Sequence, residues 1–102
     1  MAQYDLAFNE QQENLERVSA RIAVAIIAFC IDRLQRREPQ FYAEQLRKFV
    51  IAETGFAAPA SADRVLRDLR QRGIIMYRVL DRRASLYEVI ALVGFPVKSK
   101  VA

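Results

Sequence analysis

The residues best suited to chemistry stand in a row on one side of a predicted helix, within the stretch from Ala58 to Ile75. Read as a helix, this stretch lines up four small, basic or amide side chains at steps of four, three and four: Ala60, Arg64, Arg67 and Gln71. Arginine can form two hydrogen bonds with the edge of a guanine, amides pair with adenine, and alanine accepts the methyl group of thymine. The row therefore favours recognition of an anionic groove.

Ion pairing within the helix offers an alternative interpretation of the same arginines. Asp63 stands four residues before Arg67, and Asp68 four residues before Arg72, which is the favourable order for helical pairs worth a few tenths of a kcal/mol each. On that view the row is a solvated surface. Arg64 has no acid four residues before it, and a second basic element follows along the chain, so we favour a binding surface.

The residues on the opposite side of this helix predict which face is buried in the core. Its apolar residues recur with the period of a buried helical face: Ala62, Val65, Leu66 and Leu69. Pro59 suits the first helical position, where a missing N–H costs nothing, and Gly73 suits the left-handed end of a helix. We therefore expect a helix that begins at Pro59 and stops before Gly73.

After Gly73 the apolar period changes from 3.6 to two. Residues 74–80 and 85–92 are short runs rich in β-branched and aromatic side chains, which predicts a hairpin with Ile75, Tyr77 and Val79 on one face. Arg82 and Arg83 then lie in the turn, where they could contact a nucleic-acid backbone or minor groove. The alternative is that charges in the turn protect the hairpin from aggregation.

A second predicted helix precedes the first and ends at Gly55. Phe41 is expected in the core and Tyr42 at the helix cap. The expected buried face of the helix consists of Leu46, Phe49, Val50 and Ile51.

A long helix is predicted over residues 9–37, after an arm of residues 1–8. Between Ile22 and Ile31 it is apolar on every side, whereas a surface helix needs only one apolar stripe. We interpret this as a homodimer contact through one set of side chains: Val18, Ile22, Ile26 and Phe29. The alternative is a central helix covered by the arm on one side and the rest of the chain on the other. Residues 93–102 are expected to be a tail.

The segment from Phe41 to Leu92 resembles the winged helix-turn-helix superfamily. The matching pattern is a Ser, an apolar residue, any residue and an Arg, then apolar turns, a Gly and two apolar residues: Ser61, Ala62, Asp63, Arg64, Val65, Leu66, Leu69, Gly73, Ile74 and Ile75. The sequence departs from the pattern at Ala58, where a Ser or Thr cap is usual.

The resemblance implies a mainly α fold with a small β-hairpin, in which residues 38–92 form the winged helix-turn-helix head behind a long N-terminal helix. It implies binding of double-stranded DNA by a small dimeric regulator of transcription. The DNA-binding residues are then expected to be Ala60, Ser61, Arg64, Arg67, Gln71, Arg82 and Arg83. A winged helix that binds or inhibits a protein partner is the alternative function.

Charge and composition narrow the classes of function that remain possible. The net charge is +4, but residues 1–16 hold four acids and no base, so the remaining residues hold 16 bases against 8 acids, a net charge of +8. Such a basic body favours a polyanionic partner. Without His and with the single Cys30, we expect no metal site and no Cys/His catalysis. Every Ser and Tyr lacks a nearby base and the carboxylates are scattered over helix surfaces, so we also expect no enzymatic activity, no cofactor and no small-molecule substrate. The longest apolar run spans ten residues and no signal peptide is evident, so we expect a cytoplasmic protein.

Overall fold

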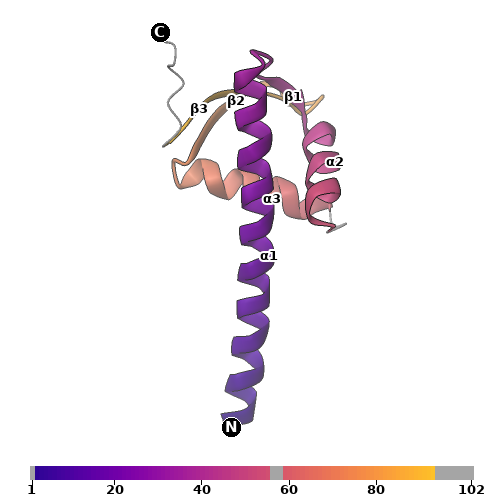
Figure 1. Cartoon of the computed structure of the whole chain (residues 1–102). Coiled ribbons are helices and arrows are strands. Elements are labelled where there is room, and N and C mark those ends of the chain that lie inside the picture. The colour runs from indigo at the N-terminus through magenta and orange to yellow at the C-terminus, as the bar shows by residue number, and fades with distance from the viewer. Residues whose placement is uncertain (1, 56–58, 94–102) are drawn as a thin grey trace.

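The computed structural model describes residues 2–55 and 59–93, with side chains described from Arg17 onwards except at residues 59 and 60 (Figure 1). Within these residues, three helices and three strands follow one another: α1 (Ala2–Gln35), β1 (Gln40–Tyr42), α2 (Ala43–Thr54), α3 (Pro59–Gln71), β2 (Ile75–Asp81) and β3 (Leu86–Leu92). This order confirms the predicted fold class, a winged helix-turn-helix topology with a long N-terminal helix.

The strands form one antiparallel sheet in the order β1-β3-β2. The hairpin of β2 and β3 was predicted, but β1 was not. Phe41 of β1 lies opposite Tyr87 of β3, and the N–H of Val89 donates to the carbonyl of Pro39 at 3.0 Å. Three residues are too few to show a strand period, so the pairing with β3 defines this strand.

α1 is one helix from Ala2 to Gln35, so residues 2–8, which we expected to form an arm, continue the helix. Nothing in that segment breaks a helix, since the chain has no Pro before Pro39 and no Gly before Gly55. Figure 1 shows the N-terminal half of α1 extending well beyond the head, while its C-terminal half packs against both α2 and α3.

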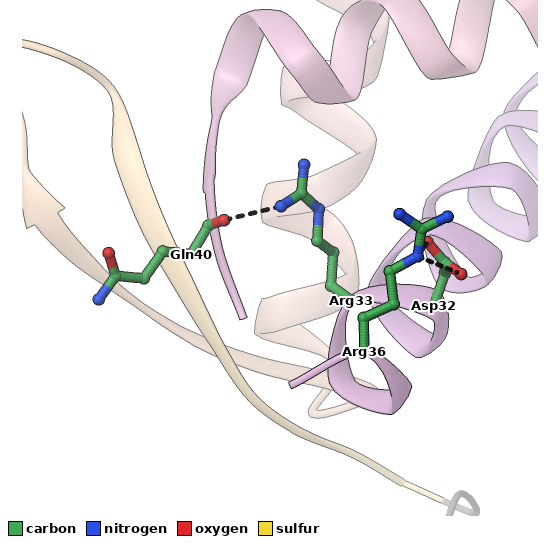
Figure 2. A network of polar contacts seen from close by, with 4 residues as sticks. All are labelled: Asp32, Arg33, Arg36 and Gln40. Atoms are coloured by element: carbon green, nitrogen blue, oxygen red, sulfur yellow. Dashed lines mark hydrogen bonds and ion pairs between the residues drawn. The ribbon is translucent and has the colours of Figure 1, made fainter. Parts of the chain in front are cut away.

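The end of α1 is held by its own arginines (Figure 2). Arg33 donates through Nη1 to the carbonyl of Gln40 at 3.1 Å, which ties the helix to β1, and Arg36 pairs with Asp32 at 3.0 Å. Arg37 adopts a left-handed φ of 61°, so the helix stops two residues before the predicted end at residue 37.

The core lies where the helices meet the inner face of the sheet. Each of the three helices and each of the three strands contributes buried apolar side chains: Ile22, Ile26, Phe29, Cys30, Phe41, Leu46, Val50, Val65, Leu66, Leu69, Ile75, Tyr77, Val89 and Leu92. Phe29 packs edge-on against Phe41, with ring centroids 5.1 Å apart, which joins α1 to β1. The predicted burial of Phe41 and of the α3 stripe is confirmed, whereas Ile51, also expected on the buried face of α2, is exposed.

The helix ends follow the predicted signals. Tyr42 is the N-cap of α2, and Gln45 Oε1 accepts a hydrogen bond from its N–H at 2.8 Å. Gly55 and Gly73 adopt left-handed φ angles of 78° and 79°. The N–H of Ile74 donates back to the carbonyl of Leu69 at 2.9 Å, which closes the end of α3.

The hairpin differs from a regular two-residue alternation. The register shifts between Met76 and Tyr77, where β3 has the extra residue, and again between Val79 and Asp81, where β2 has it. Ile75 and Tyr77 are buried as expected, but Val79 on the same predicted face is partly exposed.

Candidate nucleic-acid interface

α3 presents one row of exposed polar side chains because its other side is fixed in the core. Ala62, Leu66 and Leu69 are buried. Arg64, Arg67 and Gln71 on the opposite side are exposed, and Ser61 is half-buried. The structure therefore places these members of the predicted site on one helix, while the side chain of Ala60 lies outside the described residues.

A bidentate ion pair fixes α3 against α2. Arg47 of α2 donates through Nε to Asp63 Oδ1 at 3.1 Å and through Nη2 to Asp63 Oδ2 at 2.7 Å. The hydrogen bond with Asp63 raises the pKa of Arg47 above its ordinary value. Asp63 was expected to compete for Arg67, but its two oxygens are engaged by Arg47. Arg67 therefore loses its predicted local partner.

Arg70 in the last turn of α3 and Arg72 directly after the helix have structural partners. Arg72 pairs with Asp68 at 3.0 Å, as the spacing predicted. The guanidinium carbon of Arg70 lies 4.7 Å from the centroid of the Tyr77 ring, which joins α3 to β2. Burial raises the pKa of Tyr77, and the nearby Arg70 partly opposes that shift.

Arg64 and Arg67 differ from these neighbours. Neither side chain forms an ion pair or hydrogen bond with another residue in the part of the chain that the structure describes. Both side chains are exposed, so their donors are accessible to solvent. Of the arginines on α3, these two are thus the ones available for an external anion.

A groove of about 680 Å³ runs beside this row, between α3 and α1. Arg64, Arg67 and Gln71 line one wall, and Ala20 and Ala23 of α1 line the other. The row predicted for base contacts is therefore open to solvent but flanked by α1, which continues past α3 (Figure 1). The sequence contained no sign of this groove, because its walls are about forty residues apart.

The turn between β2 and β3 carries Arg82 and Arg83, both exposed. Neither side chain has an ion pair among the described residues, whereas Arg78 on β2 pairs with Glu88 across the hairpin at 2.6 Å. The turn is braced by α2, because the N–H of Ala43 donates to the carbonyl of Ser85 at 2.9 Å. None of the described side-chain contacts joins this turn to the row on α3.

The residues predicted for a dimer contact lie in the core of the single chain. Ile22, Ile26 and Phe29 are buried by the chain's own α2, α3 and sheet, and Val18 is half-buried against the same core. An apolar helix must be buried on all its faces, but its sequence does not show whether the same chain or a second chain buries them. The exposed apolar side chain at the centre of this segment is Val24, which is 67% exposed.

No helix among the described residues is long and apolar enough to span a membrane. Within the same residues, no group of three His, Cys, Asp or Glu side chains could hold a metal ion. No protein-family model, curated protein or solved structure matches the chain.

Proposed function

We propose that the chain binds double-stranded DNA through α3 and acts as a small regulator of transcription. The observation that supports this most is the contrast among the arginines on and directly after α3. Arg70 and Arg72 are used within the chain, while Arg64 and Arg67 stand exposed beside Gln71 without a partner among the described residues. Such a row on a helix held by a buried stripe suits the major groove.

The proposal assigns base contacts to the α3 row. Arg64 lies in the first half of the helix, where side chains of a recognition helix reach base edges, and its guanidinium can pair with guanine. Arg67 contacts a neighbouring base or a phosphate, and Gln71 suits adenine. Ser61 and Ala60, in the first turn, would lie close to the DNA, the hydroxyl donating to a phosphate and the methyl contacting thymine.

Arg82 and Arg83 are proposed to anchor the DNA backbone. They lie in a turn rather than on a helix face, and contacts of this kind fix position without reading sequence. Their contribution should therefore be similar for every sequence and strongly dependent on salt.

The experiment begins with selection of a preferred duplex from a random pool, followed by equilibrium titration of variants. Arg64→Ala should weaken binding to that duplex by about 1 to 3 kcal/mol and change affinity for a scrambled duplex much less. Arg36→Ala is the matched control, since it removes the same charge from an exposed pair with Asp32 at the far end of α1. It should leave both affinities within about twofold.

The salt dependence of DNA binding tests the role of the turn. Arg82→Ala combined with Arg83→Ala should weaken all duplexes alike and make the slope of log affinity against log salt shallower by up to about two. A wild-type chain without measurable affinity for any duplex at low salt would reject the DNA-binding proposal, as would equal losses in the Arg64 and Arg36 variants.

Binding of a protein partner is the second candidate, and exposed apolar side chains on and directly after the hairpin favour it. Met76, Ile90 and Val93 are large apolar side chains that are 53%, 48% and 70% exposed. Adjacent exposed apolar side chains often mark contact with another protein. Salt distinguishes the two candidates, because an apolar interface does not weaken steeply as salt rises whereas phosphate binding does.

A further inference from the structure

The groove between α1 and α3 combines a basic wall with a small-residue wall. Arg64 and Arg67 lie on the α3 side, while Ser19, Ala20 and Ala23 on the α1 side leave space rather than fill it. A volume of about 680 Å³ holds several side chains of an incoming segment. The groove therefore suits an acidic helix packed alongside α1.

An acidic helix of suitable length is present in the chain itself. Residues 1–16 contain four carboxylates and no base: Asp5, Glu10, Glu13 and Glu16. The backbone is helical from Ala2, and residues 2–17 extend the helix by about 24 Å at 1.5 Å per residue. A helical segment of this length is marginal in water without packing, so a covering surface would stabilise it.

This acidic half cannot enter the groove of its own chain. α1 forms one wall of the groove at Ser19 to Ala23 and continues without interruption to Ala2, leading away from the head (Figure 1). A continuous helix does not turn back on itself. The acidic half can reach such a groove only on another copy.

We propose that the acidic N-terminal half of α1 (residues 2–16) docks into the basic α1/α3 groove of a second copy. If the two α1 helices run antiparallel, each acidic half faces the partner's Arg64 and Arg67, which gives two equivalent contacts around a twofold axis. Opposite charges set the orientation, because a parallel arrangement would place acid beside acid.

The docking replaces the interface expected from the sequence with a surface that the core leaves open. The docking does not depend on the proposed function, but one of its consequences does. If Arg64 and Arg67 read DNA, the docked acidic half and DNA compete for the same side chains. Self-association would then lower the affinity for DNA.

A charge-swap experiment on the full chain tests the docking. One variant carries Arg64→Glu and Arg67→Glu, and the other carries Glu10→Lys, Glu13→Lys and Glu16→Lys. Light scattering and sedimentation at about 50 mM salt should show a dimer for the wild type and monomers for each variant alone, with dissociation constants at least about tenfold weaker. Circular dichroism confirms that each variant is folded.

The equal mixture of the two variants is the decisive sample. In that pair the acidic half of one chain meets the original basic groove, and the lysine half meets the reversed groove, so dimers should return. Arg82→Glu with Arg83→Glu is the control, because it reverses the same number of exposed charges elsewhere and should leave the wild-type dimer intact.

Three results would overturn the docking: a wild type that is monomeric at about 100 µM in low salt, reversal variants that stay dimeric, or a mixture that stays monomeric. Titration with duplex DNA separates this failure from failure of the proposed function. A monomeric wild type that binds DNA rejects only the docking, and a dimer with the expected charge dependence that binds no DNA rejects only the DNA proposal.

Discussion

Cys30 should make the stability of the fold fall at alkaline pH. It is the single cysteine of the chain and lies fully buried on α1. Burial raises the pKa of its thiol from 9.0 to about 12, because a thiolate in the apolar core would lose its hydration. The folded chain therefore retains a proton that the unfolded chain releases.

The direction and size of the change in the free energy of unfolding follow from this difference in pKa. The contribution of the protonated thiol is fully present below about pH 9 and is lost as the pH rises from 9 towards 12. One pH unit corresponds to about 1.4 kcal/mol, so the free energy of unfolding should be lower by roughly 1.4 kcal/mol at pH 10 than at pH 7.5 through Cys30 alone. Other titrating groups, including Tyr77, add their own changes.

Comparison with Cys30→Ala isolates the thiol. Urea unfolding of both proteins at pH 7.5 and pH 10 gives two differences, and the contributions of other groups cancel between them. The wild type should lose about 1 to 1.5 kcal/mol more than the variant over this interval. Equal losses in the two proteins would refute the assigned shift, as would rapid modification of Cys30 by a thiol reagent in the folded protein.

Further predictions concern the contacts that hold α3 and the core, each read by urea unfolding at neutral pH. Asp63→Asn should lower the free energy of unfolding by about 1 kcal/mol, because it breaks the half-exposed bidentate pair with Arg47. Asp68→Asn is the control on an exposed pair within one helix and should lower it by under about 0.5 kcal/mol. Equal losses in the two variants would contradict the role given to the pair that joins α2 and α3. Gly55→Ala should cost about 1 to 2 kcal/mol through its φ of 78° alone, because the space around it is open, and a stabilised variant would contradict this. Ile26→Ala should lower the free energy of unfolding by about 2 to 5 kcal/mol, because Ile26 is buried, and Val24→Ala should lower it by under about 0.5 kcal/mol, because Val24 is exposed. The reverse order would show that the buried side of α1 is misassigned.

Local signals in the sequence predicted the elements of the head well. Pro59 and Gly73 mark the first residue and the stop of α3, and its apolar period identifies the side that is buried. The change to a period of two predicts the hairpin. These features depend on residues within one or two turns of each other, so a linear reading captures them.

Contacts between distant segments could not be predicted in the same way. β1 is a strand only because β3, more than forty residues later, pairs with it. Arg47 and Asp63 lie on different helices, sixteen positions apart, so Asp63 was assigned to the nearer Arg67. The groove beside the α3 row depends on how α1 crosses α3, and the acids of residues 1–16 acquired a proposed role only once that crossing was known.

The way the core is shared between the two ends of the chain affects biosynthesis. Phe29 lies on α1, whereas Val89 and Leu92, which complete the same core, belong to β3 and are synthesised later. At ~5 to 20 residues per second, the roughly sixty residues between Phe29 and Leu92 take about 3 to 12 s to synthesise. During that interval the apolar side of α1 is exposed to chaperones and to neighbouring nascent chains. The yield of folded protein in a cell should therefore depend on what this helix meets before β3 leaves the ribosome.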